Sequence, residues 1–491
     1  MKEKRKIFLS ILLIATMLLQ IFGYAMFSGE TLMVHAAQGL GTPEDPYQIS
    51  TVEDLRNISG QYDKHFILVS DIDMEGVDDF SPLGSWSTPF TGTLDGNGYK
   101  IKNFKMDSEA IYIALFAYAK NAVIKNLVME NTDVTGERYV AGLVGVAIDS
   151  TIENCSVQGS FQGHDYIGAL VGNARGATKV KNCTADATVT GDNFLGLIVG
   201  EFRSLRVSGG RISSIEGCYG SGSVHGKYQV GGITGYLNAE GGLGLLQNNS
   251  MRGQVSGIDY VGGIAGYVQN GDMNYNYNEA DVTGRNYVGG LVGLIWEDAA
   301  ISESFNLGDV TGSGSTGGIA GDASGNEIIN SYNCGDVTGS GSTGGIAGSA
   351  ALEITNCYNT GNVSGGRFVG GISGDIYNYL ISNCVVMNGN IYGSDSNYLG
   401  RIVGYMNGEH SSNNHAYDDM AVHVNDTIWD VKNMNPETVS KHGQNTVGTD
   451  LLIEDFYRTT LNWDMDHVWV MPSEGEGFPV LRNIDVRVLE N

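Results

Sequence analysis

The sequence predicts an all-β protein, a right-handed parallel β-helix of about eleven coils with a cap at each end. Three observations support this prediction. A short glycine-bounded tetrad recurs along most of the chain, the repeat contains no stretch with a helical period, and 71 of the 491 residues are Gly. Glycine at about twice its usual share, with scarce Pro, excludes collagen. A hydrophobic content of 42% excludes a flexible low-complexity chain.

Residues 1–36 have the pattern of an export signal. Basic residues between Lys2 and Lys6 precede an almost wholly apolar run, Ile7 to Phe22, and Val34-His35-Ala36 resembles a cleavage site. The alternative is an uncleaved membrane anchor, because the apolar run can be extended to about Phe27. Both interpretations place the remaining chain outside the cytoplasm, since the positive end stays inside. We therefore expect a secreted or cell-surface protein.

Residues 37–110 are the predicted N-terminal cap of the solenoid. A cap is expected because the end of a solenoid would otherwise expose open strand edges. The run Ser50-Thr51-Val52-Glu53 is typical of a capping box that starts a short helix. Two strand-like runs follow it, Phe66 to Val69 and Phe90 to Leu94.

Residues 111–408 form the predicted solenoid. The first full tetrad is Gly142-Leu-Val-Gly145, and a degenerate copy, Ala114 to Ala117, lies 28 residues earlier. Each unit has an aromatic residue before the tetrad, then Ile-x-Asn, then a short β-branched piece closed by Gly. Three short strands fit one coil, and eleven coils stacked at about 4.8 Å give a rod of roughly 50 Å. The later tetrads end at Gly172, Gly200, Gly235, Gly266, Gly293, Gly321, Gly348, Gly374 and Gly404.

Two features complete the description of the array. The stretches Gly308 to Gly321 and Gly335 to Gly348 are identical, which only a tandem array explains. Residues 409–491 lose the tetrad and contain Trp429, Trp463 and Trp469, so we expect a C-terminal cap or small closing module there.

The tetrad resembles the GLUG motif, which is named for its Gly-Leu-hydrophobic-Gly core. The segment Gly41 to Ile49, together with Gly92 to Gly98, is similar to the region that commonly precedes such repeats. The resemblance implies a bacterial surface or secreted protein with a β-helical region, similar to the non-catalytic part of IgA-specific metallopeptidases. It does not imply peptidase activity, because the zinc signature HExxH is absent from the sequence. The wall-attachment signature LPxTG is absent as well.

The charge limits the classes of partner. The chain carries a formal net charge of −27, and such a field repels nucleic acid and anionic lipid surfaces. We therefore expect no nucleic-acid partner, and membrane contact only through an uncleaved N-terminal segment. No cofactor is predicted, because the glycine-rich loops that match GxGxxG, such as Gly312 to Gly317, are products of the repeat.

Five cysteines occupy one column of the repeat, directly after the Asn position. Ser304 and Ser331 occupy this column in other coils, which indicates a small, buried side chain. A disulfide between Cys357 and Cys384 is conceivable, but buried free thiols are the preferred interpretation, and Cys334 lies off the column. The column contains Cys155, Cys183, Cys218, Cys357 and Cys384.

Two further columns have alternative interpretations. An aromatic residue opens the tetrad strand in seven coils, and these rings either stack on each other at a corner, which we prefer, or stack against sugars. Asp281, Asp309 and Asp336, continued by Asn362, are interpreted as solvated turn residues, with calcium as the alternative. The aromatic column consists of Tyr139, Tyr166, Phe194, Tyr260, Tyr287, Phe368 and Tyr398.

One cluster of basic residues is the candidate ligand site. Arg175 and Arg203 both fall three residues after the last Gly of the tetrad in adjacent coils, so we expect them to stack. A basic patch beside an insertion at about 201–214 could hold an anionic glycan, unless Glu201 and its acidic neighbours neutralise it. The predicted patch contains Arg175, Lys179, Lys181, Arg203, Arg206 and Arg211.

Three functions are compatible with these patterns. The preferred one is a non-catalytic adhesion or binding rod for an extracellular glycan or protein. The second is a β-helical polysaccharide lyase or glycoside hydrolase, for which no recognised catalytic constellation is present. The third is a passive structural scaffold. We expect no catalytic residues, and repeat proteins host many functions on one fold.

Overall fold

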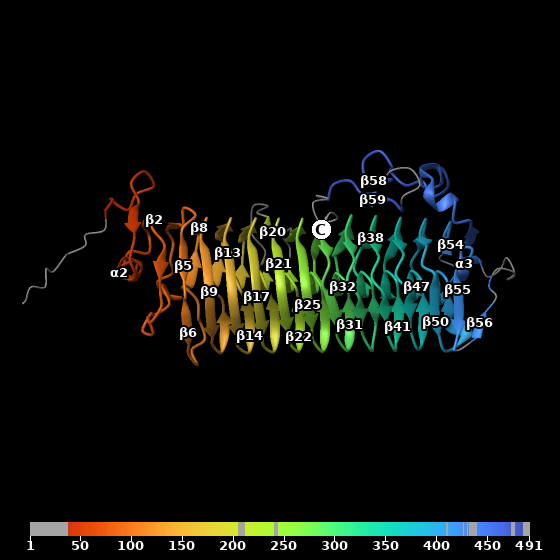
Figure 1. Cartoon of the computed structure of the whole chain (residues 1–491), viewed down its shortest axis with the longest axis horizontal. Helices are drawn as coiled ribbons and strands as arrows, with labels where there is room; N and C mark the ends of the chain where they lie inside the picture. Colours follow the sequence, from red (N-terminus) through yellow and green to blue (C-terminus); the bar gives the residue numbers. More distant parts are fainter. Residues whose placement is uncertain are drawn as a thin grey trace, which may run out of the picture.

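The computed structural model is a parallel β-helix, an elongated rod in which the chain advances from one end to the other (Figure 1). It describes residues 38–204, 212–239, 244–408, 411–425, 427–429, 431, 439–472 and 477–484. The predicted export signal lies outside the described residues. One sheet has 14 parallel strands, and the solenoid has about 13 turns, where the sequence predicted about eleven.

The difference in coil number has a simple origin. The tetrads belong to a sheet of 11 parallel strands, from β7 (Phe116–Lys120) to β52 (Val403–Asn407), which matches the eleven copies counted in the sequence. The 14-stranded sheet begins earlier, with β1 (Tyr47–Ile49), β2 (His65–Leu68) and β4 (Thr93–Asp95). Residues predicted to cap the rod therefore form its first levels, without a tetrad.

One coil shows how the sheets are built. After β7, the chain forms β8 (Val123–Lys125) in the 14-stranded sheet, β9 (Val128–Thr135) in a third face and β10 (Arg138–Val140) in a sheet of 10 strands. It then enters the next tetrad strand. The other tetrad strands are β11 (Val144–Ile148), β15 (Val171–Arg175), β19 (Val199–Arg203), β23 (Thr234–Asn238), β27 (Ala265–Gln269), β32 (Val292–Trp296), β37 (Ala320–Ser324), β42 (Ala347–Ala350) and β47 (Ser373–Tyr377).

The third face changes along the rod. In the first half, each coil contributes one long strand, such as β17 (Thr184–Thr190). From Tyr277 onward each coil contributes two short strands instead, such as β29 (Tyr277–Asn278) and β30 (Asp281–Thr283). A buried Asn column fills the break, and the Asn333 amide donates to the oxygens of Gly335, at 2.7 Å, and Asn359, at 2.8 Å. The Asn side chains therefore supply hydrogen bonds where the strand is interrupted.

The corners explain the glycine and asparagine content. Asn154 and Asn182 have φ of 54° and 51°, a left-handed conformation that Asn adopts more readily than most residues. At the tetrad, a Cβ added to Gly172 would lie 2.8 Å from the carbonyl oxygens of Gly145 and Tyr166. Only Gly fits there, because adjacent coils approach each other backbone to backbone.

A short helix near the N-terminus matches the predicted capping box with a shift of one residue. The helix α2 (Val52–Arg56) has Thr51 as its N-cap, and Asp54, not Glu53, completes the box. Burial acts to raise the pKa of the Asp54 carboxyl, but hydrogen bonds from Ser50 and Thr51 outweigh it and lower that pKa. The sequence predicted the wrong pair because Ser50 and Glu53 have the same spacing as Thr51 and Asp54.

The polar columns behave as the sequence indicated. All six cysteines are free, five of them buried in one column, and Cys334 is exposed. Asn249 and Asn276 also occupy that column, so it accepts a larger side chain than Cys or Ser. In the Asp column, the Asp309 carboxylate accepts the backbone N–H of Asp336 at 2.9 Å. Each carboxylate therefore accepts a backbone donor of the next coil.

The C-terminal region closes the end of the rod and then covers one side of it. The helix α3 (Val439–His442) and strand β57 (Gln444–Thr446) lie at the end. The chain then runs back, so that β58 (Trp469–Val470) and β59 (Val480–Leu481) lie near β38 (Glu327–Ile329) in Figure 1. We call residues 451–472 and 477–484 the side module.

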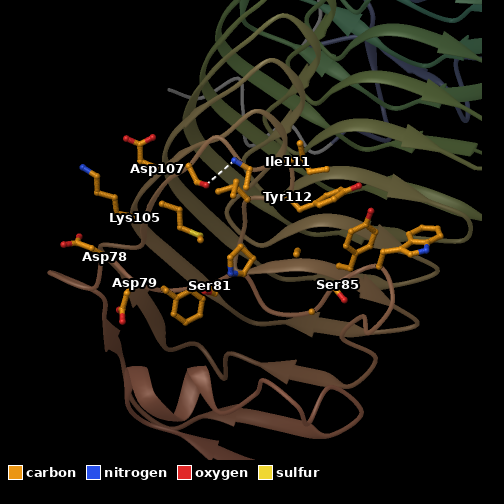
Figure 2. Close-up of a pocket in the computed structure, with 18 of the residues that line it drawn as sticks. Asp78, Asp79, Ser81, Ser85, Lys105, Asp107, Ile111 and Tyr112 are labelled. Atoms are coloured by element: carbon orange, nitrogen blue, oxygen red, sulfur yellow. Dashed lines mark hydrogen bonds between the residues drawn. The ribbon is translucent and has the colours of Figure 1, made fainter.

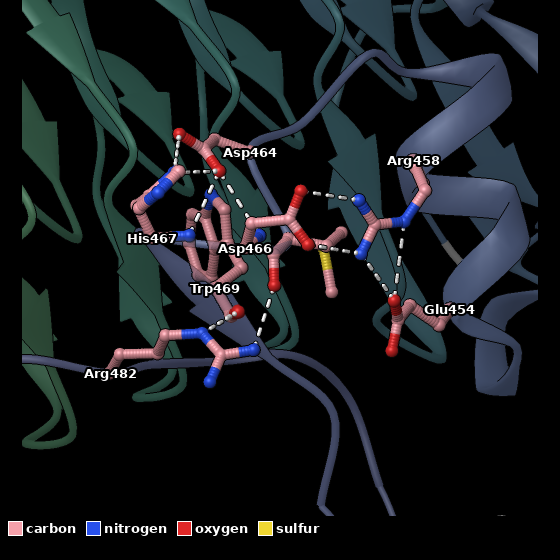
Figure 3. A network of polar contacts seen from close by, with 8 residues as sticks. Glu454, Arg458, Asp464, Asp466, His467, Trp469 and Arg482 are labelled. Carbon is pink, nitrogen blue, oxygen red and sulfur yellow. Dashed lines mark hydrogen bonds and ion pairs between the residues drawn. The ribbon is translucent and has the colours of Figure 1, made fainter.

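Polar contacts hold the side module together (Figure 3). Arg458 forms ion pairs with Glu454, at 2.7 Å, and Asp466, at 3.0 Å. The guanidinium of Arg482 donates to the carbonyl oxygens of Trp469 and Met465, each at 2.7 Å. These contacts hold the segment around Arg458 and the segment around Arg482 against residues 465–469.

Candidate functional site

An aromatic column lies on the outside of the corner between the 10-stranded and the tetrad sheets. Tyr139, Tyr166 and Phe194 stack face to face, with ring centroids 4.7 and 4.8 Å apart and interplanar angles of 6° and 1°. Tyr112 extends the stack at 5.0 Å from Tyr139. The predicted self-stacking is confirmed for these rings and for Tyr260 with Tyr287, at 5.1 Å and 6°. Phe368 and Tyr398, at the far end of the predicted column, instead meet edge to face at 5.1 Å and 73°. We call Tyr112, Tyr139, Tyr166, Phe194, Tyr260 and Tyr287 the corner ladder.

The corner ladder is half-buried, and its rings present edges to the surface. Each ring from Tyr139 to Phe194 covers a face of the next one, so these faces are not free for a ligand. The guanidinium of Arg138 lies 5.2 Å from the ring centroid of Tyr166 and pairs with Asp165 at 3.2 Å. Within this stack the ring edges are therefore the accessible surface.

A second aromatic column was not recognised in the sequence. Tyr277, Phe305, Tyr332 and Tyr358 stack at 5.2, 4.8 and 4.7 Å, and we call them the covered ladder. The side module packs on it: Trp469 lies 5.8 Å from Tyr358, whose hydroxyl donates to the Pro479 carbonyl oxygen at 2.7 Å. The repeated aromatic-Asn pair was the available signal in the sequence, at intervals of 26 to 28 residues.

A pocket of about 920 Å³ lies at the N-terminal end of the corner ladder, within the size range of small-molecule sites. We call it the N-terminal pocket. Figure 2 shows its charged side chains, Asp78, Asp79, Lys105 and Asp107, gathered on one side, away from Ser85. Aromatic rings contribute to the rest: Trp86 and Tyr112 both contact Tyr118, at 5.7 and 4.8 Å between centroids. The remaining polar lining residues are Ser81, Ser87 and Ser108.

The loop that bears Trp86 is anchored at both ends. Leu83 N–H donates to the Leu115 carbonyl oxygen, and Phe90 N–H donates to that of Tyr118, each at 2.9 Å. Within the loop, the Ser85 and Thr88 hydroxyls lie 2.8 Å apart. The Trp86 side chain is nevertheless 68% exposed. A fixed loop therefore holds a large apolar side chain in solvent beside a pocket.

The predicted basic patch is only partly assembled. Arg175 and Arg203 are register partners in adjacent coils, as expected. Lys179 and Lys181 lie in a different sheet, in β16 (Lys179–Lys181), and Lys181 pairs with Glu216 at 2.8 Å. Arg206 and Arg211 lie outside the described residues.

A buried carboxyl lies beside the two stacked arginines. Glu201 is 4% exposed, 3.5 Å from Arg203, and it accepts a hydrogen bond from the Asn173 amide. Arg175 donates to Asn173 at 2.5 Å. Burial raises the pKa of Glu201, although the charge of Arg203 opposes this shift. The two guanidinium groups are thus held by groups of the protein itself.

Two further carboxyls lie beyond Tyr287, where the corner ladder ends. Ser315 and Ser342 replace aromatic residues there, and Asp322 and Asp375 lie one and three coils after Leu294 in the adjacent column. Burial raises the pKa of both carboxyls, and Ser342 and Ser349 donate to Asp375 at 2.5 and 2.6 Å. Within the described ranges, no group of three or more His, Cys, Asp or Glu could hold a metal ion.

Comparison with known proteins places the tetrad in a described motif. The GLUG motif matches residues 136–162 and 163–190, so the chain carries GLUG repeats. "Halomucin" of Haloquadratum walsbyi is 32% identical over 149 residues, 28% of this chain and 2% of the relative. A "Putative Gly-rich membrane protein" of Evansella cellulosilytica is 34% identical over 134 residues, 25% of this chain and 15% of the relative. The chain thus matches only a small part of either relative's length.

A crystal structure of a "putative immunoglobulin A1 protease" from Bacteroides ovatus aligns with 90% of this chain and 94% of its own, at 22% identity and a TM-score of 0.23. In the described part of the chain, no helix is both long and apolar enough to span a membrane.

Proposed function

We propose that this protein is a secreted or cell-surface binding rod without catalytic activity, which attaches to an extracellular glycan or protein along its corner ladder. The observation on which the proposal rests is the difference between the two aromatic columns. The covered ladder is occupied by the side module, and nothing in the described chain covers the corner ladder in the same way. Aromatic residues that stay accessible on a rigid surface are typical of recognition sites.

The rod supports this function by its regularity. Parallel coils keep each corner ring at a fixed height, so a partner meets a surface that is already ordered and loses little entropy in ordering it. One of the relatives is named a membrane protein, which supports a location at the cell surface. The net charge of −27 supports an uncharged or basic partner over an anionic one.

The basic patch stays a separate prediction. Arg175 and Arg203 stack, but Asn173 and Glu201 hold them, so we expect a weak contribution to anion binding. Arg203→Ala should leave partner binding within about twofold of the wild type at physiological salt. A loss of partner binding larger than this would indicate that the basic patch is the main binding site.

A binding experiment tests the proposal. Residues 37–491 would be incubated with arrays of glycans and of extracellular matrix proteins, in parallel with a Tyr139→Ala/Tyr166→Ala variant. We expect binding by the wild-type rod and a loss of at least about tenfold in the variant. Tyr219→Ala is the matched control, because Tyr219 is an exposed tyrosine, 38% accessible, outside both ladders. Absence of binding to both arrays would overturn the proposal.

The enzymatic alternative has its own experiment. The rod would be incubated with acidic and neutral polysaccharides, and unsaturated products and new reducing ends would be measured. We expect none. Product formation that Arg203→Ala or Asp375→Ala abolishes would establish a lyase or hydrolase instead.

A further inference from the structure

We infer that the N-terminal pocket binds an uncharged pyranose ring of a glycan, with the ring packed against Trp86. The inference rests on the proposed function and names the ligand class and the place where it binds. Four observations support it: the exposed tryptophan, the fixed loop, the hydroxyl-rich lining and the arrangement of charge.

Trp86 is poorly explained by packing within the chain. Its indole meets Tyr118 edge to face, at 5.7 Å and 78°, and the side chain stays 68% exposed. Such an exposed apolar surface is costly in water, and burial against a ligand would recover this free energy. The edge contact leaves indole ring surface accessible for that purpose.

The geometry of the loop reduces the entropic cost of binding. Leu83 and Phe90 are hydrogen-bonded to the first tetrad strand on either side of Trp86. Gly84 makes the close approach possible, because a Cβ at its φ of +78° would lie 2.8 Å from the Tyr118 carbonyl oxygen. The tryptophan is therefore presented before the ligand arrives.

The lining fits a sugar better than a hydrocarbon or a peptide side chain. A pyranose has a face of C–H bonds and a rim of hydroxyl groups. Tyr112, Tyr118 and Trp86 supply aromatic surface for such a face, whereas serine hydroxyls and carboxylates supply partners for the rim. Burial raises the pKa of Tyr118, so its phenol stays protonated.

The charge of the pocket selects against anionic sugars. Asp79 is paired with Arg56, and Lys105 is 3.5 Å from Asp133. Asp78 and Asp107 make no ion pair among the described residues, so the charged side of the pocket retains negative charge. A uronic acid or a sulfated sugar would be repelled there, whereas neutral hydroxyl groups can donate to these carboxylates.

The stacked rings of the corner ladder explain why the site lies at one end. Between Tyr139 and Phe194 each ring covers the next, which leaves only edges for a partner. At the N-terminal end the stack finishes at Tyr112, which borders the pocket. Tyr112 contacts Tyr118 there, at 4.8 Å between centroids, and a ring of the ligand would extend this aromatic surface beside Trp86.

The experiment measures binding of defined polysaccharides to residues 37–491. Mannan, dextran and xyloglucan are the uncharged probes, and alginate, polygalacturonate and heparin are the anionic ones. Affinity would be measured for the wild type and for Trp86→Ala, Trp86→Phe and Trp296→Ala. Trp296 is the matched control because it is an exposed tryptophan, 45% accessible, in a tetrad strand far along the rod.

We expect at least one uncharged probe to bind more tightly than every anionic one. Trp86→Ala should lose at least about tenfold in affinity for it, Trp86→Phe less, and Trp296→Ala should equal the wild type. Circular dichroism of each variant would verify the fold. Anionic probes binding more tightly, an unchanged affinity in Trp86→Ala, or no binding of any polysaccharide would overturn the inference. Binding to matrix proteins in that last case would leave the proposed function intact.

Discussion

The covered and the corner ladders use the same stacking but have different surroundings. In both, aromatic rings stack at 4.7–5.2 Å, close to the spacing between coils. Phe305, Tyr332 and Tyr358 are only 2–5% exposed beneath the side module, whereas the corner rings keep accessible edges. We infer that stacked rings help to hold the coils together whether the ladder is covered or accessible. Only its outer surface decides whether it can also bind a partner.

The largest effect is expected where the covered ladder meets the side module. Trp469 is fully buried and stacks on Trp463 at 4.7 Å. Trp469→Ala should remove about 3–5 kcal/mol of the free energy that holds the module on the rod. Limited proteolysis should then cleave the region 451–484 much faster than in the wild type. Trp296→Ala provides the control, and equal cleavage rates would show that the module is held by other contacts.

A smaller loss is expected in the buried Asn column behind the covered ladder. Asn333→Ala leaves one N–H of the buried Asn306 amide and the carbonyl of Gly335 without the partner that Asn333 provides. We expect a destabilisation of about 2–3 kcal/mol in urea unfolding, because unsatisfied buried polar groups lose their hydration without compensation. Asn362→Ala, at a half-buried site of the Asp column, should change stability much less. Similar losses in the two variants would contradict the role of burial.

The contact between the rod and the side module should also respond to pH. His415 is buried beside Phe456 of the side module, and burial lowers its pKa from 6.5 to about 4. The unfolded state then binds more protons between these values, so stability falls as the pH decreases from about 6.5, by about 2 kcal/mol at pH 5. In His415→Gln this part of the acid dependence should disappear. An unchanged pH profile in that variant would assign the acid sensitivity to other groups.

The smallest effect is expected in the corner ladder itself. Tyr166→Ala removes one ring between two stacked neighbours but leaves a surface that is already half-exposed. We expect a loss of about 1–2 kcal/mol, since each aromatic pair contributes about 0.5–1.5 kcal/mol beyond burial. Thermal unfolding of Tyr166→Ala beside Tyr332→Ala measures the comparison directly. A larger loss in Tyr166→Ala would show that the corner stack is the main source of cohesion.

The repeat made much of the fold predictable, because a fixed period places equivalent residues in register. The register of Arg175 with Arg203, the Cys column and the corner stack all followed from spacing alone. The first levels of the rod were missed because β1, β2 and β4 pair in the sheet without a tetrad.

The site was far less predictable than the fold. Trp86 occurs in a loop outside the repeat, so no column identifies it, and its exposure depends on where Leu83 and Phe90 are attached. The return of the side module over the covered ladder joins residues more than 100 positions apart, such as Tyr358 and Pro479. Such contacts leave no trace in local patterning. The aromatic-Asn pairs are visible in the sequence, but nothing in it indicates that the side module covers their rings.

The two identical stretches of sequence occupy adjacent coils in matching register, with Thr316 beside Thr343 and Ala320 beside Ala347. Deletion or insertion of one 27-residue unit between these identical stretches would therefore change the rod by one whole coil, about 4.8 Å, without a mismatched joint. Loss of the unit that contains Tyr332 would bring Phe305 next to Tyr358, still two aromatic rings under the side module. The rod can thus change its length by whole coils while both of its ends stay intact.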